Sequence, residues 1–172
     1  MRKVSEIIKG LPIGVQNVRE ILTEGYVYAD KTRHAKHLID QGKHYFLSRP
    51  RRFGKSLFLN TLMEILKGNK ELFKECYIYN SDYDWQEHPV VLFDFSKIAN
   101  NDPQKFEEAL KTRLEIIAET HNVSIITSDI QVGLDTLIVR LSHKYKSKVV
   151  VLIDEYDKPI IDRLHNLDVA KE

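Results

Sequence analysis

The amino-acid sequence predicts a three-layer α/β domain with a mostly parallel sheet and helices on both faces. Two runs of strand length, residues 90–95 and 149–153, are rich in apolar residues and do not alternate with polar ones, which is typical of strands buried on both faces. Segments with a helical period precede and follow these runs. Strands that alternate with helices usually form a parallel sheet, because each crossover helix packs on a face of it.

The chain has 172 residues, and 42% of them are hydrophobic, which is enough for one ordinary core. We expect residues 44–172 to form this core domain and residues 1–43 to form a helical and extended segment that packs on it. Lys and Arg total 26 against 25 Asp and Glu, so the net charge of +1 gives no general attraction to nucleic acid or to anionic membranes. Any basic site must therefore be local.

The cysteine count and the hydropathy pattern bear on location. The single cysteine, Cys76, excludes an internal disulfide and suits a reducing compartment. No window approaches the ~18–20 apolar residues of a membrane-spanning helix. We therefore expect a cytoplasmic protein without a membrane segment.

The N-terminal half is expected to contain an extended segment, two helices and a strand. Residues 26–28 are the extended segment, and Asp30 is placed to cap a helix over residues 31–41 that ends at Gly42. Residues 44–48 are a short predicted strand. An apolar helix follows, from about residue 57 to residue 66, and Gly68 ends it.

The C-terminal half is expected to continue the alternation. A short helical piece covers residues 70–75. An acid-rich loop containing Asp82, Asp84 and Trp85, which we expect to be solvated turn material, leads to the first apolar strand. Asp102 and Pro103 are a good N-cap and first residue for a long helix, and a second helix is expected to begin near residues 128–129. The apolar run 149–153 is then the strongest prediction of a central strand.

The loop between the strand at 44–48 and the apolar helix carries four cations within seven residues, Arg49, Arg51, Arg52 and Lys55. Like charges at this density repel one another unless an anion lies among them. Residues 54–56 match the last three positions of the GxxxxGK[ST] phosphate loop, between a predicted strand and a predicted helix as that motif requires. Backbone N–H groups would face phosphate oxygens, Lys55 would reach the outer phosphates, and the hydroxyl of Ser56 would bind Mg²⁺.

One position departs from the phosphate-loop pattern, because its first glycine would fall at residue 49, which is arginine. A second motif supports the nucleotide interpretation. Asp154 and Glu155 follow the apolar strand 149–153, where an aspartate can hold Mg²⁺ and a glutamate can orient an attacking water. The alternative for this pair is an acidic N-terminus that complements the dipole of a following helix.

Four segments in order resemble one family, namely YADKT at residues 28–32, SRPRRFGKSLFL at 48–59, PVVLFDFS at 89–96 and VLIDEYDKPI at 151–160. The chain is identified on them as a member of the AAA-ATPase-like family of bacterial proteins, whose longer members often carry a C-terminal restriction-endonuclease-like domain. The resemblance implies a P-loop NTPase-like fold, ATP and Mg²⁺ as ligands, Walker A residues at Lys55 and Ser56, and Walker B residues at Asp154 and Glu155. Arg49 is typical of this family. The expected nucleotide-binding residues are Arg51, Arg52, Phe53, Gly54, Lys55, Ser56 and Leu57, with Ser56 and Asp154 on the metal and Lys55 and Glu155 in catalysis.

The resemblance also implies parts that this sequence does not contain, a sensor strand, an arginine finger, lid helices and a nuclease domain. We expect a domain truncated before the sensor strand, and we expect its unpaired sheet edges to favour self-association. Nucleic acid is expected as a partner only through the missing C-terminal part. Two functions stay open, a Mg²⁺-dependent ATPase module and a nucleotide- or phosphate-binding module without hydrolysis.

Three weaker interpretations complete the sequence-based hypotheses. A direct nucleic-acid surface formed by Arg49, Arg51 and Arg52 is disfavoured, because the net charge of the chain is close to zero. His34 and His37 share a helix face, but no further ligand has convincing spacing for a metal. Residues 30–32 are either a capped helix start or neighbours of the nucleotide, and the sequence favours the capped helix.

Overall fold

The computed structural model describes residues 10–48, 53–98 and 102–159. The chain divides into two compact units, Met1–Gln86 and Glu87–Glu172, which we call unit 1 and unit 2. Each unit has its own hydrophobic core. In the described part of the chain every helix is too short or too polar to cross a lipid bilayer.

Unit 1 is helical in its described part. A core of apolar side chains contributed by all its helices holds it together, with Phe73, Ile65 and Ile78 fully buried and Cys76 nearly so. Its α-helices are α1 (Val18–Thr23), α2 (Thr32–Gln41) and α3 (Lys55–Leu66), and its 3₁₀ helices are η1 (Lys70–Phe73) and η2 (Tyr77–Asn80). The predicted helices over residues 31–41 and 57–66 are confirmed with small shifts of their starts.

Polar side chains of α3 fasten the short helix α1. The Asn60 side-chain oxygen accepts the Val18 N–H at 2.7 Å, one of the N–H groups that a helix start leaves without a partner in the helix. Buried Glu64 accepts from the Arg19 guanidinium at 2.5 Å and from the Asn69 side-chain amide at 2.9 Å. A buried carboxylate needs such donors because it is costly to leave unpaired. These contacts fix α1 against α3.

Asp30 and Thr32 connect the start of α2 to η2. The Asp30 carboxylate accepts the Thr32 N–H at 2.8 Å through one oxygen and the Tyr77 N–H at 2.7 Å through the other. The hydroxyl oxygen of Thr32, which is fully buried, accepts the Ile78 N–H at 3.1 Å. Helix α2 thus begins one residue later than predicted, with Lys31 at the N-cap position, and Asp30 accepts the N–H of its first residue. The structure supports the helix-start interpretation of residues 30–32, with a second role in holding η2.

Trp85 packs into unit 1 just before the boundary between the units. Its ring lies 6.0 Å from that of Phe73 and 5.2 Å from that of Tyr83, and it adopts a φ of 55°. Asp82 nearby pairs with Lys36 at 2.9 Å. The expectation that this segment is solvated turn material is therefore wrong for Trp85, because its ring joins the core of unit 1.

Unit 2 contains the sheet. Strands β1 (Val90–Asp94) and β2 (Val150–Asp154) pair in parallel with Val90 beside Val150 and Asp94 beside Asp154, as the two apolar runs predict. Two long helices follow β1 along the chain, α4 (Pro103–Thr120) and α5 (Ile130–Tyr145), after the short 3₁₀ helix η3 (Phe95–Lys97). The side chain of Asp102 caps α4, as predicted, and α5 begins where predicted, with Asp129 as its N-cap.

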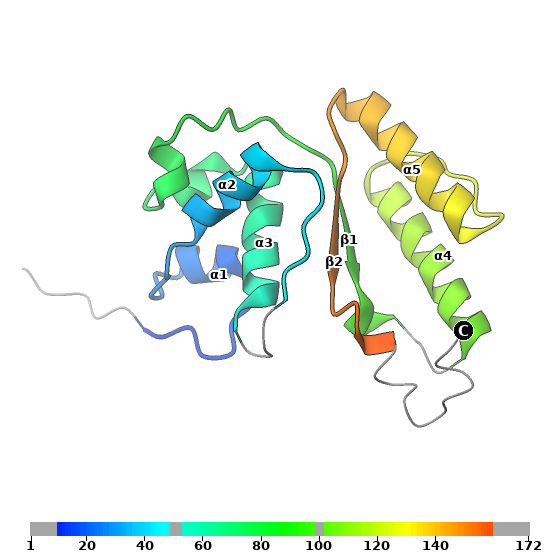
Figure 1. Cartoon of the computed structure of the whole chain (residues 1–172), viewed down its shortest axis with the longest axis horizontal. Helices are drawn as coiled ribbons and strands as arrows, with labels where there is room; N and C mark the ends of the chain where they lie inside the picture. The colour runs from blue at the N-terminus through cyan, green and yellow to red at the C-terminus, as the bar shows by residue number, and fades with distance from the viewer. Residues whose placement is uncertain (1–9, 49–52, 99–101, 160–172) are drawn as a thin grey trace, which may run out of the picture. The chain divides into compact units, whose positions relative to one another are not determined.

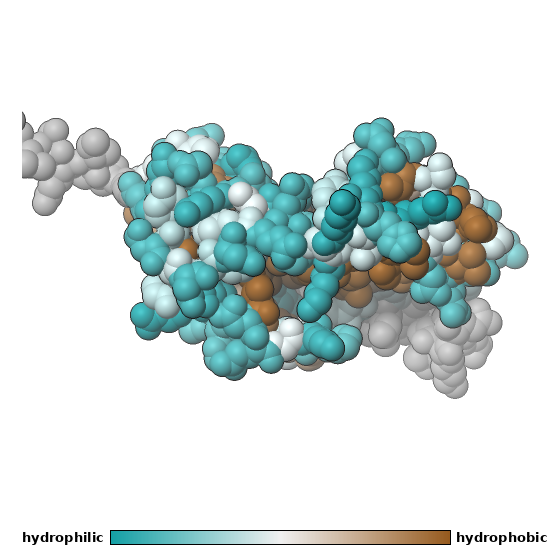
Figure 2. Space-filling view, turned by 90° about the horizontal axis from the view of Figure 1, so that it is seen from above, coloured by the Kyte–Doolittle hydropathy of each residue, from teal (hydrophilic) through white to brown (hydrophobic). Residues whose placement is uncertain are grey.

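Helices α4 and α5 cover one face of the sheet (Figure 1). Val91 and Phe93 of β1 pack with Leu114 of α4 and with Leu137 and Leu141 of α5. Paired residues of parallel strands point to the same face, so Val151 and Ile153 of β2 share this face with Val91 and Phe93. Brown apolar surface gathers in Figure 2 over unit 2, whereas unit 1 is mostly teal.

Two predictions about the sheet need correction. Residues 44–48 form no strand, and all of them are exposed, because the segment has no hydrogen-bonded strand beside it among the described residues. Strand β2 is not buried on both faces, since the side chains of Val151 and Ile153 are 38% and 49% exposed. The structure is a mixed α/β arrangement with a two-stranded parallel sheet in its described part, and a three-layer fold is not confirmed.

Candidate functional site

The start of α3 carries the predicted phosphate-loop residues. Gly54 immediately precedes the helix in the left-handed conformation, with φ of 73° and ψ of 27°. Among the described residues no atom would lie within 4 Å of a Cβ at this position, so the backbone angle and not crowding favours glycine. The first helical hydrogen bond runs from Phe58 N–H to the Gly54 carbonyl at 3.0 Å. Among the described residues, the N–H groups of residues 55–57 have no hydrogen-bond partner.

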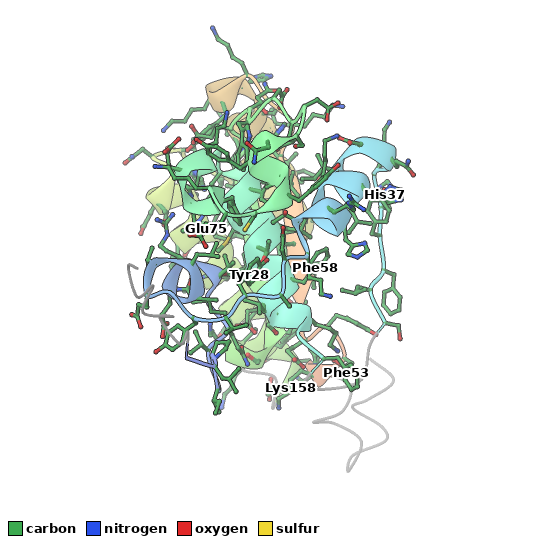
Figure 3. The ribbon with its side chains drawn as sticks, turned by 90° about the vertical axis from the view of Figure 1, so that its left-hand side faces the viewer. Tyr28, His37, Phe53, Phe58, Glu75 and Lys158 are labelled. Carbon is green, nitrogen blue, oxygen red and sulfur yellow. The ribbon has the colours of Figure 1, made fainter. Side chains whose placement is uncertain are left out.

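The predicted side chains around this helix start differ in burial. Phe53 is 65% exposed and Gly54 is exposed, whereas Lys55 and Ser56 are half-buried. Figure 3 shows Phe53 at the amino end of α3, with Phe58 one turn further into unit 1. Leu57 packs against the core of unit 1. Arg49, Arg51 and Arg52 lie outside the described residues.

A chain of hydroxyl groups connects this first turn to the segment before α2. The Thr61 hydroxyl donates to the Leu57 carbonyl at 2.9 Å, and the Tyr28 hydroxyl lies 3.2 Å from the same Thr61 oxygen. Because the Thr61 hydroxyl proton is already used in the hydrogen bond to Leu57, the Tyr28 hydroxyl is the donor in the bond to Thr61. Burial raises the pKa of Tyr28, which keeps the phenol protonated for this role. Sequence reasoning missed Thr61, although a threonine inside an apolar helix is itself a signal.

The end of β2 carries the predicted acids. Glu155 has a φ of 51°, a conformation that is uncommon and strained for a residue with a side chain. Its N–H donates to the Asp154 carboxylate at 3.0 Å, and its carbonyl accepts the Lys158 N–H at 3.0 Å. The strand therefore ends in a tight turn at these acids. Both Asp154 and Glu155 are half-buried.

A third acid, Asp94, lies at the end of the neighbouring strand and in register with Asp154. Its carboxylate accepts the Ser96 hydroxyl at 2.6 Å and the Ser96 N–H at 3.1 Å, and it pairs with the Lys97 ammonium at 2.9 Å. Burial raises the pKa of Asp94, but the donors at Ser96 and Lys97 outweigh burial and hold it below its ordinary value. Sequence reasoning assigned Asp94 no role. An aspartate ending an apolar strand was the available signal.

Gly54, Lys55 and Ser56 lie together at the start of α3 in unit 1. Asp154 and Glu155 lie together at the end of β2 in unit 2. A single site would need both sets, and their joint action stays a prediction. No group of three or more His, Cys, Asp or Glu side chains gathers as a metal site within residues 10–48, 53–98 and 102–159. A nucleotide-bound Mg²⁺ needs fewer protein ligands than that, because phosphates and water supply the others.

Residues 12–172 match the family described as Predicted AAA-ATPase. The chain belongs to this AAA-ATPase-like family. It is also 41% identical over 166 residues to an uncharacterized protein in the vnfD 5' region of Azotobacter chroococcum mcd 1. This match covers 95% of the chain but only 32% of the relative, so the chain spans about a third of the relative's length. No solved structure matches the chain.

Proposed function

We propose that this AAA-ATPase-like chain binds ATP with Mg²⁺ through the start of α3. The observation that carries the proposal is the left-handed glycine directly before α3, together with three N–H groups that have no partner in the described structure. N–H groups at a helix start, with the positive end of the helix dipole behind them, favour bound phosphate. Membership of the family supports the same ligand.

The proposed roles follow from the chemistry of each side chain. Lys55 would place an ammonium on the outer phosphates, and Ser56 would offer its hydroxyl to Mg²⁺. Asp154 would hold the metal from the end of β2. The N–H of Glu155 already occupies one Asp154 oxygen, so the other oxygen is the proposed metal contact. Mg²⁺ would neutralise part of the phosphate charge when it is bound.

Hydrolysis is a second step of the proposal and depends on Glu155. Its carboxylate would orient the attacking water and accept a proton from it. The strained backbone of Glu155 supports this role, because strained conformations concentrate at functional positions. We propose no catalytic role for the other residues of this loop. They would only give the loop around the phosphates its shape and its positive charge, and they are Arg51, Arg52, Phe53 and Leu57.

Binding is tested by titrating ATP into the protein by calorimetry, with and without Mg²⁺. Lys55→Ala should weaken binding by about tenfold to a hundredfold, since hydrogen bonds to a charged group contribute about 1.5–3 kcal/mol. An unchanged ATP affinity in this variant would rule out the proposed site. Gln41→Ala, an exposed change at the end of α2, is the control and should leave the affinity unchanged.

Gly54→Ala tests the helix start more narrowly. Alanine at a positive φ costs about 1–2 kcal/mol, so the variant should lose stability and also bind ATP more weakly. Gly14→Ala is the matched control, because Gly14 has a φ of 79° and open space around it, as Gly54 does. The control should lose similar stability and keep its ATP affinity. Equal effects of the two variants on binding would contradict a phosphate contact at residue 54.

Hydrolysis is measured separately as phosphate release. Glu155→Gln should keep ATP binding and reduce release by about a hundredfold or more, in the range that a general base contributes. Binding without release from the unmodified protein would favour the second function, a nucleotide-binding module. Release that Glu155→Gln does not change would exclude the proposed water-orienting role.

A further inference from the structure

The first turn of α3 has little support on its outer side. Phe53 is 65% exposed and Gly54 is exposed, so the described residues directly before the helix give its amino end little packing. The Phe58 N–H donates to the Gly54 carbonyl at 3.0 Å and closes this turn. The ends of a helix open more easily than its middle, because fewer hydrogen bonds within the helix hold them. A well-defined first turn therefore needs support from the side that faces the core of unit 1.

Thr61 gives this support at the carbonyl of Leu57. Its side chain is buried, and its hydroxyl donates to that carbonyl at 2.9 Å. A threonine in a helix can bond in this way to the carbonyl four residues before it. The same hydroxyl here also accepts a hydrogen bond from Tyr28, 33 positions earlier in the chain, at 3.2 Å (Figure 3). The phenol holds the Thr61 hydroxyl in place, and the hydroxyl holds the carbonyl.

Tyr28 belongs to a segment that is itself anchored. The Asp30 carboxylate accepts the Thr32 N–H of α2 at 2.8 Å through one oxygen and the Tyr77 N–H of η2 at 2.7 Å through the other. The ring of Tyr28 also packs against the core of unit 1. Residues 28–32 therefore join the first turn of α3 to α2 and η2, and a fixed segment can hold a helix turn in one conformation.

We propose that Tyr28 and Thr61 are positioning residues for the phosphate site at the start of α3. By holding the Leu57 carbonyl, they keep the first turn closed, so that the N–H groups of residues 55–57 are ready to receive phosphate oxygens. Neither side chain touches the ligand. A turn that is ordered before binding loses less conformational entropy when the ligand arrives, and this raises the affinity. The role rests on the proposed ATP site and adds the residues that keep it in shape.

Titration of ATP with Mg²⁺ into the whole chain by calorimetry tests this role. Tyr28→Phe removes only the phenol oxygen, and Thr61→Val removes both hydrogen bonds of the Thr61 hydroxyl. Each variant should raise the dissociation constant of ATP about threefold to tenfold, which corresponds to the net contribution of an ordinary hydrogen bond. Thr61→Ser keeps the hydroxyl and should restore the affinity. Unchanged affinity in both Tyr28→Phe and Thr61→Val would overturn the proposal.

Two matched variants separate positioning from a general loss of stability. Tyr77→Phe makes the same chemical change on a tyrosine of unit 1 that is 45% exposed. Ile78→Val shortens a fully buried side chain of the same core and should destabilise unit 1 about as much as Tyr28→Phe does. Both controls should keep the ATP affinity of the unmodified protein. If Ile78→Val weakens binding as much as Tyr28→Phe, lost stability alone explains the effect and the proposal is wrong.

Hydrogen exchange without ATP separates this role from the proposed function. The Phe58 amide reports on the first turn of α3, and its exchange should be about threefold or more faster in Tyr28→Phe than in Tyr77→Phe. The Phe106 amide, which donates to the Asp102 carbonyl in the first turn of α4, should not change. Unchanged exchange at Phe58 would contradict the role even if ATP binds. Faster exchange in a protein that binds no ATP would mean that the proposed function is wrong, although the two residues hold the turn.

Discussion

Unit 1 and unit 2 are stabilised in different ways. In unit 1, short helices are held by side chains that reach backbone N–H groups far away in the sequence, as when Asp30 binds Tyr77 and Asn60 binds Val18. In unit 2, two long helices pack through apolar residues on a regular parallel ladder. Unit 1 thus adds individual long-range polar contacts to its apolar core, whereas unit 2 is held mainly by apolar packing on the ladder. Truncating an apolar side chain is therefore the informative change in unit 2, and removing a single hydrogen bond is the informative change in unit 1.

The largest effect is expected in the core of unit 2. Leu137 is fully buried among residues of β1, α4 and α5, so Leu137→Ala should lower the free energy of unfolding by about 2–5 kcal/mol. Urea denaturation followed by circular dichroism measures this loss. Val139→Ala on the same helix is the control, because Val139 is half exposed and should change stability by less than about 0.5 kcal/mol. Similar losses in the two variants would mean that Leu137 is not the core residue described.

A smaller loss is expected from one hydroxyl in unit 1. Thr32→Val keeps the shape of a fully buried side chain but removes the acceptor for the Ile78 N–H. A buried donor left without a partner costs about 1–3 kcal/mol. Hydrogen exchange at the Ile78 amide should accelerate together with this loss. Thr112→Val, at an exposed position of α4, should have little effect on stability or on that amide.

The smallest effect concerns pH and Asp94. Its pKa in the folded protein lies below the ordinary 3.8. The carboxylate therefore stabilises the fold above about pH 4, and this contribution is lost as the pH falls through the lowered pKa. Stability curves from pH 6 down to about 2 should fall less steeply for Asp94→Asn than for the unmodified protein. Ser96→Ala, which removes one donor, should give an intermediate slope. Parallel curves for all three proteins would contradict this account.

The sequence predicted unit 2 more fully than unit 1. Helix α4 begins at the aspartate expected to cap it, α5 begins near residues 128–129 as expected, and the two apolar runs are the two strands. These features rest on local patterns of side chains. The strand expected at residues 44–48 did not form, because a strand requires a neighbour and local apolarity does not supply one.

The candidate site was predictable only in its local motifs. The glycine before α3 and the acids ending β2 follow from short patterns, and the structure gives them the backbone conformations that such turns need. The bond from Tyr28 to Thr61 joins residues 33 apart, and the contact of Asp30 with Tyr77 joins residues 47 apart. No short pattern encodes either contact. The burial of Glu64 was not predicted either, because the apolar residues around it in α3 give no sign of a buried carboxylate.

Trp85 gives unit 1 an optical label of its own. It is the single tryptophan of the chain, its ring packs beside Phe73 and Tyr83, and its indole nitrogen is shielded from solvent. The fluorescence emission of Trp85 should shift to longer wavelength when unit 1 unfolds. It should not change when α4 and α5 unfold. Comparing emission with ellipticity in one denaturation series would therefore reveal whether the halves of the molecule unfold together or in sequence.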